Sequence, residues 1–195
     1  MKRKIILASK SPRRKSLLEQ IGLRFDTRES KYEEDMEKYS DPYKLVKYLA
    51  LKKAEDVARH YKNAIIIGAD TVVIVKNKIV GKPKDAKEAK NILEDVSGKK
   101  YTVLSGYAVI DTKNKKAING VGEAKVEFKK LSNKEIDSYI STGEPFDKAG
   151  GFGIQNVAAV FIEGVQGDFY SIVGLPLNKI YEALKRMGVD VLEKL

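Results

Sequence analysis

The sequence predicts an α/β fold, because segments with the patterns of strands and of helices alternate along the chain. The continuous apolar runs at residues 64–69 and 72–75 are typical of a central strand that is buried on both faces. Residues 43–60 and 176–187 instead repeat their apolar side chains at helical spacing. A length of 195 residues suits one domain, residues 1–195, with a sizeable core.

The first elements are a strand at residues 4–8 and a helix at residues 12–21 that ends at Gly22. Ser11 stands directly before Pro12, which is the ordinary order of an N-cap and a first helical residue. On this interpretation the segment does no more than start a helix.

The same helix start also favours phosphate binding. Its first backbone N–H groups have no partner within the helix and lie at the positive end of the helix dipole. Arg13 and Arg14 add fork-shaped donors, and Ser9 and Ser11 add hydroxyl groups. The segment by itself leaves both interpretations open.

A polar, acid-rich stretch follows at residues 24–41, and we expect it to be irregular. The next segment, residues 43–60, predicts a helix with one lysine, Lys53, inside its apolar stripe. An inward lysine needs an anionic partner, either a protein carboxylate or a ligand phosphate. The alternative is that its stem packs while its ammonium group reaches water.

Asp70 interrupts the apolar run of the expected central strand, where carboxylates are rare. A hydrogen-bonded turn residue would explain it. The neighbouring Thr71 and the Gly-Lys-Pro sequence at residues 81–83 favour a functional site instead.

The second half of the chain continues the alternation. Gly150, Gly151 and Gly153 would let the backbone approach another group closely. The expected elements are a helix at 85–96, strands at 101–110 and 117–129, a helix that Ser132 and Glu135 cap and that ends before Gly143, strands at 157–165 and 169–173, and a helix that starts at Pro176.

Composition excludes several classes of catalyst. The chain has no cysteine, which rules out disulfides, thiol catalysis and thiolate metal sites. Its single histidine, His60, falls at the end of an expected helix, where a structural role suits it better than a catalytic one. Any catalytic metal would therefore be a hard, oxygen-bound ion such as Mg²⁺ or Mn²⁺.

The formal charge of +10 raises the possibility of a polyanionic partner. The lysines are scattered through amphipathic segments, so we expect a solvated surface and no stable nucleic-acid complex. No apolar run is long enough for a membrane span or a signal peptide, and we expect a cytoplasmic protein without membrane contact. The common P-loop and dinucleotide-binding motifs are absent.

Five motifs in register over the whole chain resemble the Maf family of nucleoside triphosphate pyrophosphatases. They are SKSPRRKSLL at residues 9–18, GADTVV at 68–73, GKP at 81–83, GEPFDKAGGFGIQ at 143–155 and GDFYSIVGLP at 167–176. The resemblance implies an elongated α/β fold with a mixed, curved sheet and two lobes around a cleft, similar to that of inosine triphosphate pyrophosphatases. It also implies a hydrolase that uses a divalent cation, Mg²⁺ or Mn²⁺, to convert a nucleoside triphosphate to the monophosphate and pyrophosphate, a house-cleaning activity.

The resemblance further implies roles for individual residues. Asp70 matches the proposed general base of the family. The sequence leaves open whether it acts as a base, as a metal ligand or as both. An acidic residue of the Glu-Glu pair, Glu33 or Glu34, matches a carboxylate expected near the metal. The phosphate-binding positions are Ser9, Ser11, Arg14, Lys53 and Lys82.

Three positions imply the subgroup that acts on dTTP and UTP: Arg13, Thr71 and Gln155. The amide of Gln155 offers a donor and an acceptor, which match the imide N–H and carbonyl of thymine or uracil. Asn156 departs from the family, which usually has glycine there, and Phe152 replaces a frequent tyrosine. The chain could also form a homodimer. Alternative functions are a regulatory protein of septum formation and a nucleic-acid-binding module.

Overall fold

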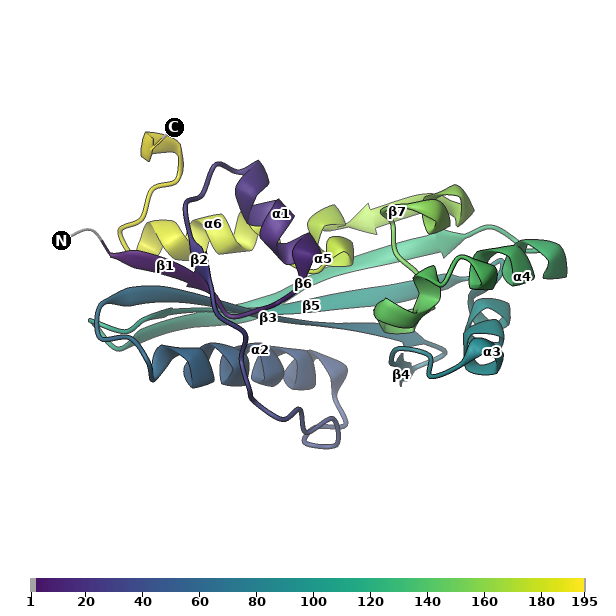
Figure 1. The fold of residues 1–195 in the computed structure, drawn as a ribbon, viewed down its shortest axis with the longest axis horizontal. Coiled ribbons are helices and arrows are strands. Elements are labelled where there is room, and N and C mark those ends of the chain that lie inside the picture. The colour runs from purple at the N-terminus through teal and green to yellow at the C-terminus, as the bar shows by residue number, and fades with distance from the viewer. Residues whose placement is uncertain (1–2, 195) are drawn as a thin grey trace. The chain divides into compact units, whose positions relative to one another are not determined.

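The computed structural model describes residues 3–194, and in this range strands and helices alternate as predicted (Figure 1). The strands are β1 (Lys4–Leu7), β2 (Asp26–Thr27), β3 (Ala64–Val75), β4 (Lys78–Val80), β5 (Lys100–Asp111), β6 (Lys116–Phe128) and β7 (Ile162–Gly167). The α-helices are α1 (Pro12–Gln20), α2 (Pro42–Ala58), α3 (Ala86–Val96), α4 (Asn133–Ser141), α5 (Phe169–Val173) and α6 (Leu177–Arg186). Short 3-10 helices are η1 (Glu144–Asp147), η2 (Ala149–Gly151), η3 (Val157–Phe161) and η4 (Leu192–Lys194).

The strands form one mixed sheet in the order β2-β1-β3-β5-β6-β7, with β4 paired to β3. β1 pairs in parallel with both β2 and β3, and Ile6 lies opposite Ile66 in the second pairing. β4 and β7 run antiparallel to their partners. The predictions of an α/β fold and a mixed sheet with flanking helices are confirmed.

The chain divides into two compact units. The first contains the chain up to Asp70, Ser105–Gly122 and the chain from Gly174 onward. The second contains Thr71–Leu104 and Glu123–Val173. β3, β5 and β6 contribute residues to both units, so the chain passes between them several times.

In the first unit α2 covers one face of the sheet, and α1 and α6 lie on the other face (Figure 1). Two glycines let α2 approach closely. A Cβ atom on Gly106 would lie 2.1 Å from the carbonyl oxygen of Val46, and one on Gly68 would lie 2.5 Å from that of Ala50. Contacts this short are not tolerated, so any larger residue at either position would push α2 off the sheet.

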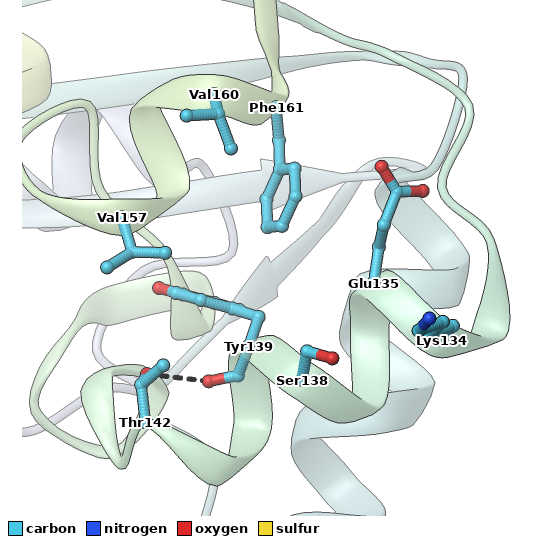
Figure 2. A pocket seen from close by; sticks show the side chains of 8 residues that line it. All are labelled: Lys134, Glu135, Ser138, Tyr139, Thr142, Val157, Val160 and Phe161. Atoms are coloured by element: carbon cyan, nitrogen blue, oxygen red, sulfur yellow. Dashed lines mark hydrogen bonds between the residues drawn. The ribbon is translucent and has the colours of Figure 1, made fainter.

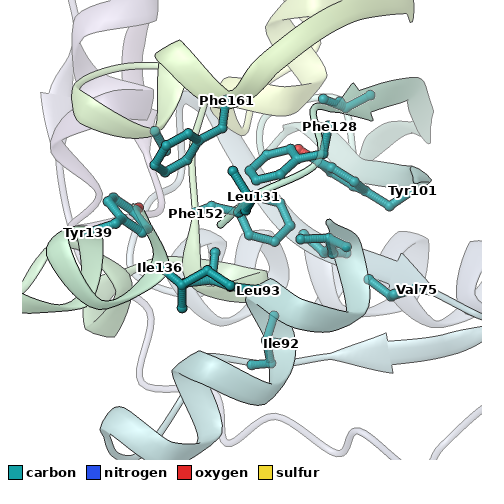
Figure 3. Close-up of a cluster of buried hydrophobic side chains, with 14 of the residues drawn as sticks. Val75, Ile92, Leu93, Tyr101, Phe128, Leu131, Ile136, Tyr139, Phe152 and Phe161 are labelled. Carbon is teal, nitrogen blue, oxygen red and sulfur yellow. The ribbon is translucent and has the colours of Figure 1, made fainter. Parts of the chain in front are cut away.

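The core of the second unit is aromatic (Figure 3). The ring of Phe152 lies 4.7 Å from Tyr101 and 5.1 Å from Phe128, and Phe161 lies 5.5 Å from Tyr139, measured between ring centroids. Because Phe152 is only 5% exposed, its aromatic ring contributes to this core.

One predicted strand, at residues 169–173, is wrong, and another, at residues 157–165, is wrong in its first five residues. The first five residues of the segment 157–165 form the 3-10 helix η3, and only its remainder enters β7. Residues 169–173 form the helix α5, because Asp168 caps them: its Oδ1 accepts a hydrogen bond from the Tyr170 N–H at 3.0 Å, and its Oδ2 accepts one from the Ser171 hydroxyl at 2.8 Å. Both segments are rich in apolar and β-branched residues, a pattern that strands and short buried helices share.

Two short strands were not predicted. β2 lies within the segment expected to be irregular, and β4 follows a two-residue turn at Lys76 and Asn77. Both turn residues have positive φ angles, as tight hairpins require. Among the described residues, no helix is long and apolar enough to cross a membrane.

Candidate active site

The turn from β1 into α1 has the predicted geometry of a capped helix start. Ser11 is the N-cap, with Pro12 in the first turn, and its hydroxyl oxygen accepts the Arg14 N–H at 3.5 Å. The Ser9 hydroxyl oxygen accepts the Ser11 N–H at 3.2 Å, and Ser9 is buried. The capped start is therefore confirmed, and its use in phosphate binding stays a prediction.

Arg14 joins this turn to the last of the sequence motifs. Its Nη1 donates to the Ser9 hydroxyl at 3.3 Å, and its Nε donates to the Gly174 carbonyl at 2.9 Å. Desolvation lowers the pKa of Arg14, while the negative charges of Asp70 and Glu34 raise it. The guanidinium group stays charged, because arginine does not lose its proton in proteins. The structure thus places a partly buried, oriented cation in the first turn of α1.

Lys53 lies between two carboxylates. Its Nζ is 2.5 Å from Asp70 Oδ1 and 2.6 Å from Glu34 Oε1. The side chains of Lys53 and Asp70 are only 14% and 8% exposed, whereas that of Glu34 is 45% exposed. The structure decides between the two interpretations of Lys53: the lysine points inward and has anionic partners.

Close packing of α2 on β3 explains how this contact forms. Gly68 and Asp70 are two residues apart on β3, so both face the same side of the strand. Gly68 lies directly against Ala50 and Ala54 of α2, and Lys53 precedes Ala54. The absence of a side chain at Gly68 therefore brings the Lys53 ammonium within reach of Asp70.

The position of Glu34 distinguishes it from Glu33. Both side chains are exposed, and the Glu34 carboxylate is the one that contacts Lys53. Glu34 and Asp70 each direct one carboxylate oxygen at Lys53 Nζ, and the second oxygen of each carboxylate is a hard donor of the kind that suits Mg²⁺ or Mn²⁺. Within residues 3–194 no group of three or more acidic or histidine side chains is arranged to hold a metal ion. A pair of carboxylates nevertheless fits Mg²⁺, which is usually bound by one or two carboxylates and by phosphate oxygens of the substrate.

Other predicted residues belong to the second unit: Thr71, Lys82 and Gln155. There the Gly150 N–H donates to the Gly81 carbonyl at 2.9 Å, and Gly151 packs on Pro83. These contacts join the loop that carries Lys82 to the loop that carries Gln155. Lys82 and Gln155 are both exposed.

The sequence analysis missed a buried ion pair in the loop at residues 143–157. Glu144 Oε2 accepts the Val157 N–H at 3.1 Å, and its Oε1 lies 3.6 Å from Lys148 Nζ. Both side chains are at most 10% exposed, and Lys148 also donates to Asp147 Oδ1 at 2.9 Å. Glu144 therefore holds both ends of residues 148–157, the segment that contains Gln155. The spacing of glutamate and lysine by four residues was the available signal.

Asn156, the departure from the family pattern, has φ 69° and ψ −150°. Glycine adopts this conformation readily, whereas a side chain makes it strained. The family's usual glycine thus has a physical reason at this position.

A surface pocket of about 410 Å³ lies elsewhere, between α4 and η3 (Figure 2). Tyr139, Val157, Val160 and Phe161 supply apolar walls, and none of the predicted site residues lines it. Glu135, which also lines the pocket, accepts hydrogen bonds from Lys129 Nζ and from the Ser132 N–H. The pocket therefore has no residue in common with the Lys53 cluster, which consists of Lys53, Asp70 and Glu34.

Fold and site together define an α/β protein in which a carboxylate–lysine–carboxylate cluster and an oriented arginine accompany a helix N-terminus. The chain belongs to the Maf-like protein family, whose model matches residues 4–187.

Relatives of similar length share nearly half of its residues. The chain is 46% identical over 193 residues to a dTTP/UTP pyrophosphatase of Dictyoglomus turgidum, an alignment that covers 98% of this chain and 100% of the relative. It is 44% identical over 189 residues to a dTTP/UTP pyrophosphatase of Bacillus cereus, covering 97% and 98%. A solved structure of a nucleoside-triphosphatase/dITP/XTP pyrophosphatase from Mycobacterium abscessus is 15% identical and covers 72% of this chain and 95% of its own, with a TM-score of 0.43.

Proposed function

We propose that this protein hydrolyses dTTP and UTP to the nucleoside monophosphate and pyrophosphate, with the help of a divalent cation. The observation that carries the proposal is the cluster in which Lys53 contacts both Asp70 and Glu34. The dTTP/UTP pyrophosphatases that share almost half of its residues over nearly the whole chain support the choice of substrate.

The chain's own residues supply a binding site for the triphosphate. The N-terminus of α1, the hydroxyl groups of Ser9 and Ser11, and the Arg14 guanidinium are donors suited to phosphate oxygens. The Gly174 carbonyl holds Arg14 in orientation, so little side-chain freedom is lost when a phosphate binds. We assign Lys53 and Lys82 to phosphate oxygens as well.

The reaction is attack of water on the α-phosphorus. Asp70 accepts the proton of the attacking water, the new P–O bond forms, and the bond from the α-phosphorus to the bridging oxygen breaks. Pyrophosphate leaves with that bridging oxygen and its electron pair. Lys53 offsets the negative charge that Asp70 and Glu34 concentrate beside the substrate.

The cation would be Mg²⁺ or Mn²⁺, held by Asp70 and Glu34. When bound, it neutralises phosphate charge and polarises the phosphoryl group. We assign selectivity for pyrimidine bases to Arg13, Thr71 and Gln155, with the Gln155 amide matching the edge of thymine or uracil. The cytoplasmic location and the homodimer stay predictions from the sequence.

A nucleotide panel tests the proposed function. Purified protein with Mg²⁺ or Mn²⁺ should release pyrophosphate from dTTP and UTP faster than from purine triphosphates, and chelation should abolish the reaction. Asp70→Asn should lower kcat by about 10²–10⁴-fold, because general-base catalysis contributes on that order. Asp95→Asn, which changes an exposed partner of Lys76, is the matched control and should leave kcat unchanged. Release of orthophosphate, or turnover of no triphosphate, would contradict the proposal.

A further inference from the structure

Glu34 belongs to a segment that has no regular secondary structure, between the end of β2 at Thr27 and the start of α2 at Pro42. Its side chain is 45% exposed, yet its carboxylate lies 2.6 Å from Lys53 Nζ. An irregular segment loses conformational entropy when it is ordered, so other contacts must hold this carboxylate in place.

Asp56 makes the contacts that precede Glu34 in this segment. Its Oδ2 accepts a hydrogen bond from the Ser30 hydroxyl at 2.9 Å and one from the Lys31 N–H at 2.8 Å. The Ser30 hydroxyl oxygen in turn accepts the Tyr32 N–H at 3.1 Å. The two hydrogen bonds that Asp56 accepts are stronger than bonds between neutral groups, because the acceptor is charged. They lower the pKa of Asp56, with the Lys31 N–H as the largest cause.

A second contact lies on the other side of Lys53 along α2. The Tyr32 hydroxyl donates to the Tyr48 hydroxyl at 3.2 Å, and this hydrogen bond raises the pKa of Tyr32 to about 12. Asp56 follows Lys53 by three residues, a spacing that places the two side chains on the same side of a helix. Along α2, Tyr48 and Asp56 therefore bracket Lys53, which Glu34 contacts.

We propose that Asp56 is a positioning residue, which acts through Ser30 and Lys31 to hold the Glu34 carboxylate beside Lys53 and Asp70. Asp56 itself does not touch the cluster. The inference rests on the proposed function, because Glu34 would there take part in holding the divalent cation. Loss of Asp56 should therefore weaken binding of the divalent cation and leave the chemical step, which we assign to Asp70, unchanged.

The test compares Asp56→Ala and Asp56→Asn with the matched control Glu55→Gln. Glu55 is the neighbouring carboxylate on α2 and pairs with Lys52 at 2.7 Å. The Mn²⁺ concentration for half-maximal dTTP hydrolysis should rise about tenfold in Asp56→Ala, the usual effect of losing a residue that orients a ligand. The rise should be smaller in Asp56→Asn, which keeps an acceptor oxygen. At saturating Mn²⁺, kcat should stay within about twofold of wild type.

A double-mutant cycle separates positioning from a general structural role. Glu34→Gln should raise the Mn²⁺ requirement, and adding Asp56→Ala to it should raise the requirement no further, because both changes remove the same carboxylate from the site. Additive effects would overturn the inference. So would an Asp56→Ala protein whose kcat falls while its Mn²⁺ requirement stays that of wild type.

Direct binding of Mn²⁺ without nucleotide, followed by electron paramagnetic resonance of the free ion, provides a readout that does not need activity. Wild type and Glu55→Gln should bind Mn²⁺ about tenfold more tightly than Asp56→Ala. Equal affinities would overturn the inference. A wild-type protein that hydrolyses no nucleotide would contradict the proposed function alone, and the Mn²⁺ titration would still decide the role of Asp56. If Asp56→Ala fails to fold, Asp56→Asn carries the same comparison.

Discussion

At the scale of single residues, the geometry of Lys53 has the clearest consequence. A lysine in an apolar stripe is explained by its partners, since the ammonium lies within 2.6 Å of both Glu34 and Asp70. The other lysine in this turn of α2, Lys52, pairs with Glu55 at 2.7 Å and is half-buried. These adjacent lysines thus differ in their partners: the Lys53 ammonium contacts the buried carboxylate of Asp70, and the Lys52 ammonium contacts a carboxylate at the surface.

Replacing Lys53 by methionine should raise KM for dTTP or lower kcat, because the variant keeps the packed stem and loses only the ammonium group. We expect kcat/KM to fall at least about tenfold, the equivalent of one lost charge-assisted interaction of roughly 1.5 kcal/mol. Steady-state kinetics measure the effect, and Lys52→Met is the matched control. Unchanged kinetics in Lys53→Met would mean that the Lys53 ammonium group takes no part in catalysis or substrate binding.

At the scale of elements, the loop at residues 143–157 combines a closing contact with a strained residue. Glu144 binds the Val157 N–H and pairs with Lys148, so the loop is held from inside. Burial, followed by the negative charge of Glu144, raises the pKa of Tyr139, whose hydroxyl donates to Glu144 Oε1 at 3.3 Å. Asn156 lies within this closed loop, next to Gln155, in a conformation that favours glycine.

Asn156→Gly should raise the free energy of unfolding by about 1 kcal/mol, because the relief of backbone strain exceeds the extra entropy of glycine in the unfolded chain. Asn156→Ala should lower it, since alanine tolerates a positive φ less well than asparagine. Urea unfolding of the three proteins measures both changes. A less stable Asn156→Gly protein would show that the Asn156 side chain contributes more than its strain costs.

At the scale of the whole molecule, several carboxylates are stabilised as anions in the folded state. Hydrogen bonds from Lys129 and then Ser132 lower the pKa of Glu135 from 4.5 to about 2. The Lys76 ammonium lowers the pKa of Asp95, and the Lys31 N–H lowers that of Asp56. Acidic groups with lowered pKa values stabilise the fold above the pKa of the unfolded chain, and this contribution is lost as pH falls through the folded value.

Stability should therefore be nearly constant between about pH 5 and about pH 9, below the range in which tyrosine titrates, and fall as pH decreases from about 4.5 toward 2. Urea unfolding midpoints across this range measure the slope. Glu135→Gln should reduce the slope, because glutamine keeps an acceptor for the Ser132 cap and does not titrate. The same slope in wild type and Glu135→Gln would assign the acid sensitivity to other carboxylates.

Local signals were sufficient for most of the elements. Caps at Ser11, Asp85 and Ser132 and the apolar stripe of residues 43–60 predicted helices that the structure contains. The helix α5 was predicted as a strand because its cap depends on which way the Asp168 side chain turns. An apolar run has the same composition in either conformation, so periodicity could not separate them.

The sequence by itself determined the α/β alternation, the capped helix start before Arg14 and the anomalous positions of Lys53 and Asp70, because each depends on neighbours along the chain. Only the tertiary structure decided that Lys53 contacts Asp70, that Glu34 rather than Glu33 contacts Lys53, and that Asp56 holds the segment before it. These contacts join residues far apart in sequence. The contact of Lys53 with Asp70 depends on how closely α2 approaches β3 at Gly68, a distance that packing sets and that no local pattern encodes.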